Sequence, residues 1–276
     1  MNWTFVAAVN NEPVLNSCLL SSPDVGMVQE VILQRGYSSA ALAYNAGIEK
    51  ANTDLLVFAH QDMYFPEGWM ASVQGAMEVL SREDPTWGVL GVWGVKRTGE
   101  RTGHLYCAGL MRTLGEAFEG GREVRSVDEV VLIVRKSSGL RFDERLPGFH
   151  MYGGDICLEA ARRGMKCYAI SAFCIHNTNG YNMLPLQFWR SYFFMRRKWR
   201  SELPVITSCT EITFWCWPMI WWNIDRAANL ALRRHKAGTR IQDPRQMYRQ
   251  MVCSGMVTPL ASRAGRQQAA RGLLAR

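Results

Sequence analysis

The fold is decided by residues 55–63, which read Leu55-Leu56-Val57-Phe58-Ala59-His60-Gln61-Asp62-Met63. Five apolar residues in a row, preceded by the turn-forming Asn52-Thr53-Asp54, are typical of a short strand that is buried on both faces. This strand stops at three polar residues. Ligands of α/β sheets bind at the carboxyl ends of the strands, so the polar end of this strand is where we first expect functional groups.

Two further apolar runs precede this strand. Residues 4–9 are followed by Asn10, and residues 27–33 are followed by Gln34. Both runs are followed by polar or turn-forming residues, so both are predicted to be strands of the same sheet. Three strand–helix units in about eighty residues predict a parallel, nucleotide-binding α/β sheet. The side chains of Asn10, Gln34 and Asp62 should therefore meet in one crevice.

The elements around these strands follow from the same patterns. Ser38 and Ser39 precede an alanine-rich segment, and a serine hydroxyl can cap a helix by accepting one of its free N–H groups, so a helix is expected to about Ala51. A second helix is expected over residues 152–164, ending at a glycine. Further strands are predicted over residues 87–95, 127–134 and 166–175.

The composition changes at Pro185, beyond which the chain is aromatic and basic. Residues 1–184 are predicted to form the α/β domain, and residues 185–276 a mostly helical, basic C-terminal extension. The whole chain has a formal charge of +8, and residues 191–276 hold 15 Lys and Arg against 4 Asp and Glu. A segment of this kind meets phosphate in nucleic acid or in anionic lipid, or is simply a solvated surface.

Several classes of protein do not fit the composition. No apolar stretch reaches the roughly 20 residues of a membrane-spanning helix, and the first basic residue, Arg35, comes too late for a signal peptide. The eight cysteines include no CxxC pair, so they are expected to be ordinary buried thiols rather than zinc ligands or disulfides. These features predict a cytoplasmic protein.

Three segments in a fixed order resemble a known family. They are Ala43-Tyr44-Asn45-Ala46-Gly47-Ile48, then Val57-Phe58-Ala59-His60-Gln61-Asp62, then Phe142-Asp143-Glu144 through Tyr152-Gly153-Gly154-Asp155-Ile156-Cys157-Leu158. Together they resemble the bacterial family 2 glycosyltransferases with the GT-A fold, particularly the capsule-biosynthesis subgroup whose third strand ends in His-Gln-Asp. The resemblance covers residues 3–180 and implies a Rossmann-like sheet with helices on both faces.

The resemblance implies a divalent metal at Asp62. In the family the third strand ends in Asp-x-Asp, whose last carboxylate binds Mn²⁺ or Mg²⁺ at the diphosphate of a nucleoside-diphosphate sugar. Here Asp62 takes that place and His60 replaces the first Asp, while His176 is implied to complete the metal site. One carboxylate can suffice when phosphate oxygens and water fill the shell. The alternative is that Asp62 is a turn residue that bonds its own backbone.

Asp155 is implied to be the general base that takes the proton from the acceptor hydroxyl. It stands where the family has an acidic motif at the start of a helix, although Gly154 replaces the usual Glu. Such a base needs a carboxylate held beside the attacking oxygen. The alternative for an isolated Gly-Gly-Asp is a helix N-cap.

Further polar residues are expected to contact the donor. Asn10, Gln34, Ser38 and Asn45 are assigned to the nucleotide side of the crevice, because amides and hydroxyls pair with base and ribose without charge repulsion from phosphate. Asp128 lies where the family contacts the donor sugar, and a solvent-facing turn acid is the alternative.

These features predict a metal-dependent, inverting glycosyltransferase that moves a sugar to a saccharide or lipid-linked saccharide in surface polysaccharide synthesis. Inversion is implied by the resemblance alone. One rival is a nucleotidyltransferase, which usually needs a Gly/Arg/Lys-rich loop that is absent before Arg35. The other is a non-catalytic scaffold that binds nucleotide or membrane.

The C-terminal extension also predicts partners. Its tryptophans at positions 215, 217, 221 and 222 coincide with the basic segment, which leads to the hypothesis that residues 185–240 rest on the inner membrane face. The alternative is that these aromatic residues pack against the α/β domain or a second copy in a homodimer. Nucleic acid is not favoured as a partner.

Overall fold

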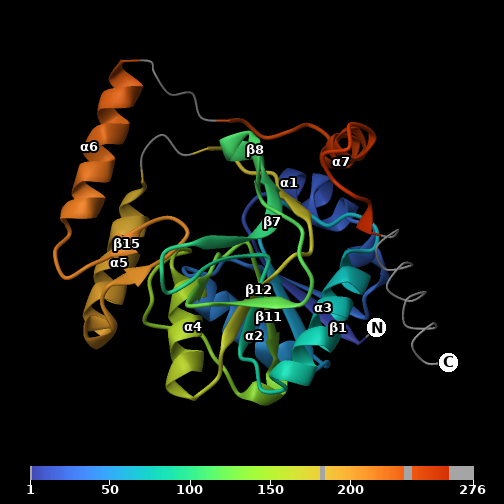
Figure 1. Cartoon of the computed structure of the whole chain (residues 1–276), viewed down its shortest axis with the longest axis horizontal. Coiled ribbons are helices and arrows are strands. Elements are labelled where there is room, and N and C mark those ends of the chain that lie inside the picture. The colour runs from blue at the N-terminus through green and yellow to red at the C-terminus, as the bar shows by residue number, and fades with distance from the viewer. Residues whose placement is uncertain (1, 181–183, 233–237, 261–276) are drawn as a thin grey trace.

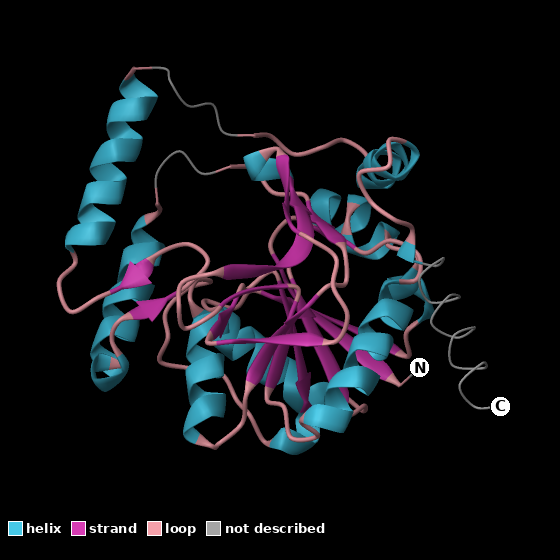
Figure 2. Cartoon of the chain, in the orientation of Figure 1, coloured by secondary structure: helices cyan, strands magenta, loops and turns pink. Residues whose placement is uncertain are grey.

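The computed structural model describes residues 2–180, 184–232 and 238–260. These residues form a large central sheet flanked by helices, which confirms the predicted α/β class (Figure 1, Figure 2). Part of the predicted C-terminal extension, residues 233–237 and 261–276, lies outside the described residues.

The central sheet is mixed, whereas the sequence predicted a parallel sheet from its first three strands. Across the sheet, its strands are β2 (Glu30–Arg35), β1 (Trp3–Val9), β3 (Leu55–Ala59), β11 (Val131–Arg135), β5 (Val89–Gly91), β12 (Cys167–Ile170) and β9 (Gly121–Val124). β1, β2 and β3 are parallel, with Val6 opposite both Ile32 and Phe58. β11 runs antiparallel to β3 and β5, and β9 runs antiparallel to β12.

A second sheet contains the strands that directly follow β3, β5 and β12 in the chain. It contains β10 (Ser126–Val127), β6 (Trp93–Val95), β7 (Arg101–Cys107), β13 (Cys174–His176) and β4 (Met63–Tyr64), with β8 (Arg112–Gly115) beside β7. A separate pair is formed by β14 (Val205–Ile206) and β15 (Glu211–Ile212).

Three predicted strands are each divided between the two sheets. Residues 87–95 give β5 and β6, residues 127–134 give β10 and β11, and residues 166–175 give β12 and most of β13. The prediction of single strands was wrong because both halves of each run are buried. An unbroken apolar run does not show where the chain leaves one sheet for the next.

The helices begin and end close to the predicted positions where capping signals are present. They are α1 (Glu12–Ser17), α2 (Ala40–Lys50), α3 (Trp69–Glu83), α4 (Tyr152–Arg162), α5 (Leu186–Lys198), α6 (Trp217–Ala231) and α7 (Pro244–Cys253). Short 3₁₀ turns span Leu19–Ser21, Asp24–Met27, Ala108–Leu110, Lys136–Ser138 and Arg200–Glu202. Ser39 caps α2, since its hydroxyl accepts a hydrogen bond from the N–H of Leu42.

Alternate side chains of the central strands build two cores, one on each face of the sheet. Phe5 and Val57 belong to one core, and their neighbours Val6 and Phe58 belong to the other. Because successive side chains of a strand point to opposite faces, apolar residues at every position require cover on both sides. α3 covers the first face, and α2 and α4 cover the second, which confirms the prediction of helices on both faces.

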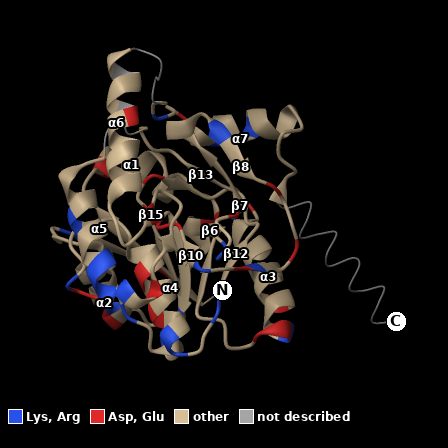
Figure 3. Cartoon of the chain, turned by 60° about the vertical axis from the view of Figure 1, so that its left-hand side comes forward, with Lys and Arg blue, Asp and Glu red and all other residues tan. Residues whose placement is uncertain are grey.

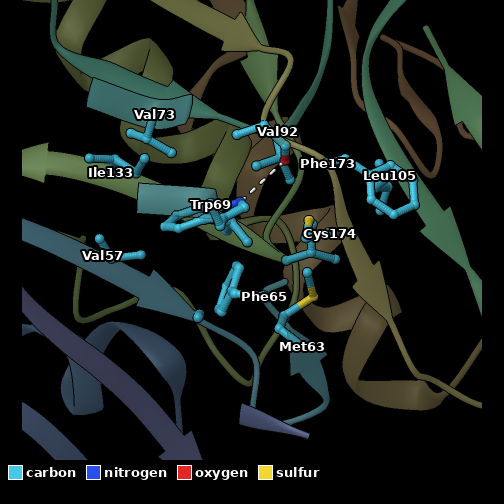
Figure 4. Packing of buried hydrophobic residues seen from close by; sticks show 14 of the residues in the cluster. Val57, Met63, Phe65, Trp69, Val73, Val92, Leu105, Ile133, Phe173 and Cys174 are labelled. Atoms are coloured by element: carbon cyan, nitrogen blue, oxygen red, sulfur yellow. Dashed lines mark hydrogen bonds between the residues drawn. The ribbon is translucent and has the colours of Figure 1, made fainter. Parts of the chain in front are cut away.

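Trp69 is the centre of the first core (Figure 4). Its indole lies next to Phe65 in that view, with the Phe65 ring centroid 4.3 Å away, and its side chain is fully buried. The indole N–H donates a hydrogen bond to the carbonyl of Ala172, at 3.2 Å. The polar atom of this large side chain is therefore satisfied inside the core.

Two glycines permit the close approach of helices to the sheet. A Cβ atom at Gly47 of α2 would collide with the side chain of Val6, and one at Gly153 of α4 would collide with the carbonyl oxygen of Val127. Both glycines belong to the segments that carry the family resemblance. Their role is to let α2 and α4 pack against the strands.

α5 is joined to α4 by a buried ion cluster. The Lys198 ammonium lies 2.7 Å from Asp155 Oδ1, 2.8 Å from Glu159 Oε1 and 2.9 Å from Asp143 Oδ2. The Trp199 indole donates to the same Asp155 oxygen at 2.7 Å. α5 thus shares the second core with the α/β part, and the division of the chain at residue 184 stays a prediction.

Two expectations from composition are tested by the structure. Among the residues that the structure describes, no helix is long and apolar enough to cross a bilayer. All eight cysteines are free. Five are buried as expected, whereas Cys209 and Cys253 are exposed and Cys216 is half-buried.

The ion cluster predicts a large effect of removing the cation that its carboxylates share. Lys198→Met takes the ammonium away from Asp155 and Glu159, while Asp143 keeps Arg145, and breaking a buried ion pair in this way costs about 3–5 kcal/mol. We expect that loss in the free energy of unfolding, measured by urea denaturation. Lys166→Met removes the matched exposed pair with Glu123 and should cost at most about 1 kcal/mol. Equal losses in the two variants would contradict the assignment.

Candidate functional site

His60, Asp62 and His176 form a compact group at the carboxyl end of β3. His176 Nε2 lies 3.4 Å from Asp62 Oδ1, and His60 Nδ1 lies 4.0 Å from the same oxygen. Each residue offers one ligand atom, and these atoms all lie within 4.8 Å of one another. The structure thus brings together the two residues predicted as metal ligands, Asp62 and His176, and adds His60.

Backbone pairing places these three side chains. The turn after β3 is closed by a hydrogen bond from the N–H of Met63 to the carbonyl of His60, and the N–H of His60 donates to Val130 at 3.1 Å. β13 then pairs with β4, so that His176 lies opposite Met63. The second sheet therefore carries His176 to the end of a central strand from which it is more than a hundred residues distant in sequence.

The charges in this group balance one another. Burial would raise the pKa of Asp62, but the adjacent imidazoles of His176 and His60 and the Arg240 guanidinium hold that pKa well below its usual value. Burial likewise opposes the charged form of His176, yet the Asp62 carboxylate outweighs it and raises the pKa of His176 to about 10. Burial lowers the pKa of His60, and Asp62 offsets this only in part. Asp62 and His176 therefore form an ion pair beside a neutral His60.

This donor set fits a divalent cation. Carboxylate oxygen and imidazole nitrogen are both ordinary ligands of Mn²⁺ and related ions, and three protein ligands leave positions for phosphate oxygens. His176 carries a proton in the metal-free group, and a ligand imidazole must be neutral. A divalent ion at this position would thus take over the positive charge that the His176 proton supplies to Asp62.

Arg240 brings a fixed positive charge to the same place. Its guanidinium Nη2 lies 3.5 Å from Asp62 Oδ2 and its Nε donates to the carbonyl of Asn177 at 3.0 Å. The Asn177 side chain forms two hydrogen bonds with the backbone of Ile241: its Oδ1 accepts from the N–H at 2.7 Å, and its Nδ2 donates to the carbonyl at 2.9 Å. A segment from the basic end of the chain is therefore fastened beside the metal-binding group.

A second pair of acids, Asp128 and Glu129, lies next to His60. The hydroxyl of Tyr152 is 2.8 Å from His60 Nε2 and donates to the carbonyl of Glu129 at 3.0 Å. Burial, followed by the nearby charge of Asp128, raises the pKa of the Glu129 carboxyl to about 8. Asp128 Oδ1 accepts the N–H of Val130 at 3.1 Å, which is the turn role weighed for it above.

Asn10 also lies close to the group. Gln61 accepts hydrogen bonds from the backbone N–H groups of Asn10 and Asn11, both at 3.0 Å, and its amide N–H₂ donates to Asn10 Oδ1. Asn10 is therefore tied to the residue that precedes Asp62, and it is exposed.

The other predicted donor contacts are less directly placed. Gln34 lies within β2 rather than after it. Its Oε1 accepts from Lys50 at 3.1 Å, while its buried Nε2 has no hydrogen-bond partner among the described residues. Ser38 is exposed beside the capping Ser39. The Asn45 side chain donates to the carbonyl of Phe142 and accepts from its N–H, and so holds the segment around Phe142 to α2. Their nucleotide contacts, and the donor-sugar contact of Asp128, stay predictions.

Asp155 is occupied by other partners. Its carboxylate contacts Lys198 and Trp199, and none of its contacts among the described residues is with the His60–Asp62–His176 group. Burial raises its pKa, and Lys198 and Trp199 only partly oppose this. The helix N-cap alternative was wrong, since the N-cap of α4 is Met151. The general-base role of Asp155 stays a prediction.

Three residues near the site, His60, Glu129 and Arg240, are not among the metal ligands or donor contacts that the sequence predicts. The position of His60 two residues before Asp62 was the available signal for the first. Glu129 and Arg240 carry no local signal, because their roles depend on where α4 and the C-terminal segment pack.

Comparison with solved structures gave distant likenesses. The mannosyltransferase PcManGT from Pyrobaculum calidifontis, in complex with GDP-Man and Mn²⁺, is 12% identical, with a TM-score of 0.47, and the match covers 97% of this chain and 84% of that one. TarS from S. aureus is 10% identical, with a TM-score of 0.47, over 72% of this chain and 65% of that one.

A curated relative matches part of the chain. It is a protein of Fuscovulum blasticum described as "ATP synthase subunits region ORF 6", and it is 29% identical over 156 residues. The match covers 54% of this chain and 61% of the relative, so the chain spans less than two thirds of that protein.

A family model described as "Glycosyltransferase like family" matches residues 4–195, which is more than half of the chain. The matched segment runs from β1 into α5 and includes His60, Asp62 and His176. The chain therefore belongs to this glycosyltransferase-like family.

Proposed function

We propose that this protein transfers a sugar from a nucleoside-diphosphate sugar to a hydroxyl group of a saccharide or lipid-linked saccharide, with inversion at the anomeric carbon. The observation that carries the proposal is the His60–Asp62–His176 group at the carboxyl end of β3 in a chain of the glycosyltransferase-like family. The family membership favours sugar transfer over nucleotidyl transfer. A role in capsule or other surface polysaccharide synthesis, a cytoplasmic location and a homodimer stay predictions.

The proposed reaction is a single displacement. The acceptor oxygen forms a bond to the anomeric carbon while the bond from that carbon to the diphosphate breaks, and its electron pair leaves on the diphosphate. The acceptor proton passes to a carboxylate of the protein. What Mn²⁺ or Mg²⁺ supplies at Asp62 is neutralisation of the negative charge that grows on the leaving diphosphate.

The protein's own groups supply the rest. Arg240 offers a fixed cation at Asp62 Oδ2, whereas His176 lies at Oδ1, and it would bind phosphate oxygens of the donor. Gln61, the residue before Asp62, and Asn10, to which it is bonded, present amides without negative charge. The same groups in a non-catalytic scaffold would bind nucleotide without turnover, so donor hydrolysis or transfer with Mn²⁺ separates the two functions.

Asp62 is predicted to be essential for metal-dependent donor binding. We expect Asp62→Asn to weaken the binding of UDP or GDP in Mn²⁺ by more than about tenfold, measured by isothermal titration calorimetry, and to leave the weak binding in EDTA unchanged. Asp54→Asn is the matched control, because Asp54 lies at the other end of the same strand and bonds Ser137. Undiminished Mn²⁺-dependent affinity in Asp62→Asn would remove this residue from the metal site.

Arg240 is predicted to recognise the diphosphate. Loss of a charge-assisted hydrogen bond corresponds to about a ten- to hundredfold loss of affinity, so Arg240→Gln should bind UDP or GDP that much more weakly and the free nucleosides as before. Arg245→Gln serves as control, since Arg245 bonds the carbonyl of Ser21 instead. An equal loss for nucleoside and nucleoside diphosphate would show that Arg240 acts only through the fold.

Two carboxylates are candidates for the general base. Asp155 is implied by the family resemblance. Glu129 is the other candidate, because its backbone carbonyl accepts from the Tyr152 hydroxyl, which lies beside His60, and because its pKa of about 8 is near the value that suits a base at neutral pH. We expect Glu129→Gln to keep donor affinity and to lose turnover by about 10²–10⁴-fold.

Asp155→Asn, measured in parallel, decides between them. A loss of thermal stability with normal turnover per folded molecule would confirm a structural role in the Lys198 cluster. The same 10²–10⁴-fold loss of turnover at unchanged stability, with Glu129→Gln active, would restore Asp155 as the base.

A further inference from the structure

An arginine-lined groove lies on the surface beside α5, and none of the described residues that line it belongs to the His60–Asp62–His176 group. Its volume is about 640 Å³, and five arginines line it, at positions 145, 190, 196, 197 and 200. None of the described residues that line it is acidic. Figure 3 shows the Lys and Arg residues of α5 in blue. A concave surface of one charge sign concentrates ions of the opposite sign.

Much of this charge is not neutralised within the protein. Arg145 is paired with Asp143, and Arg196 donates to the carbonyl of Phe214. Arg190 and Arg197 are exposed and form no hydrogen bond or ion pair with any residue that the structure describes. The groove is therefore prepared for an anion from outside the chain.

The arginines alternate with apolar side chains on the outer face of α5. Leu186, Arg190, Phe193 and Arg197 are all exposed and follow one another at intervals of three or four residues, which places them on one side of the helix, and the exposed Arg200 lies in the 3₁₀ turn that follows. Leu186 is 69% exposed and Phe193 47% exposed. An outward face that combines cations with large apolar groups is typical of helices that lie in a membrane interface.

α6 continues this surface with indoles. Trp217, Trp221 and Ile224 share one side of the helix and are 70%, 72% and 53% exposed, whereas Met219 on the opposite side is buried. Phe214, just before this helix, is half-exposed and also lines the arginine groove, so the two features are continuous. α5 and α6 lie on the same side of the molecule in Figure 1.

We propose that the arginine groove and the exposed faces of α5 and α6 dock on an anionic phospholipid membrane. Phosphates of the lipid headgroups occupy the groove, and Trp217 and Trp221 enter the interface, where indoles are favoured because one edge is apolar and the other is hydrated. A soluble phosphate compound would account for the arginines but not for the exposed indoles. A second copy of the chain, in a two-fold dimer through the same surface, would bring two arginine grooves together and would be repelled.

This docking does not depend on the proposed transferase reaction. The surface is built by α5 and α6, and α5 is held to α4 by the Lys198 cluster rather than by the metal-binding group. Membrane binding can therefore be measured without donor, acceptor or metal.

The test is co-sedimentation of the full chain with vesicles at low salt. We expect binding to vesicles that contain equal parts of phosphatidylcholine and phosphatidylglycerol, little binding to phosphatidylcholine alone, and weaker binding as salt is added. Each cation near an anionic surface contributes about five- to sixfold in affinity, so Arg190→Gln/Arg197→Gln should reduce affinity roughly thirtyfold. Trp217→Ser/Trp221→Ser should also reduce it.

Matched variants show whether the surface itself is responsible. Arg82→Gln/Arg112→Gln removes the same charge from exposed positions elsewhere, and Met27→Ser/Met256→Ser removes exposed apolar side chains elsewhere. Both should bind vesicles as the unchanged protein does. Circular dichroism of all variants checks that they are folded.

Three outcomes would overturn the proposal. One is no binding of the folded protein to the anionic vesicles at low salt. Another is an equal loss in Arg82→Gln/Arg112→Gln, which would show that only net charge matters. The third is a dimer that Trp217→Ser/Trp221→Ser converts to a monomer in gel filtration without any effect on vesicle binding, because a second copy would then cover the indoles. Inorganic diphosphate is added to the same assay as a competitor for the groove. Loss of vesicle binding in its presence, together with loss of vesicle binding in Arg190→Gln/Arg197→Gln, supports headgroup phosphate as the ligand.

Discussion

The central sheet is apolar on both faces, and the rest of the structure depends on this constraint. Because Phe5 and Val57 point to one side and Val6 and Phe58 to the other, neither face can be left to water, and helices must cover both. Glycines at positions 47 and 153 let those helices come close. With the faces closed, polar groups that belong to the strands can gather only at the strand ends, which is where the metal-binding group lies.

The candidate metal-binding group, His60, Asp62 and His176, contains a buried carboxylate whose charge is stabilised by its neighbours. Asp62 is almost entirely buried, and its carboxylate stays ionised because His176 and Arg240 supply positive charge within 3.5 Å. These two residues come from the second sheet and from the C-terminal segment. An isolated carboxylate in this place would be protonated, so the site exists only when distant parts of the chain are folded around it.

The C-terminal part of the chain contacts two separate charged groups, the Lys198 cluster and Asp62. Its first helix, α5, contributes Lys198 to a cluster of three carboxylates and turns its arginines outward. Its later segment lies beside Asp62 through Arg240 and Ile241, where Asn177 holds it by hydrogen bonds. The basic composition that the sequence shows as one block is thus divided in space between a structural ion cluster, a surface groove and a single cation beside Asp62.

The sequence by itself determined the α/β class, the first three strands, the capped helix α2 and the position of Asp62 and His176 at strand ends. Each of these follows from local patterns: short apolar runs, a serine cap and polar residues directly after a strand. Only the tertiary structure decided that the sheet is mixed, that three apolar runs are each divided between two sheets, and that Asp155 faces Lys198 while Glu129 and Arg240 lie near the metal-binding group. The physical reason is that strand pairing and charge balance are relations between segments far apart in the chain, and no periodicity within one segment records them.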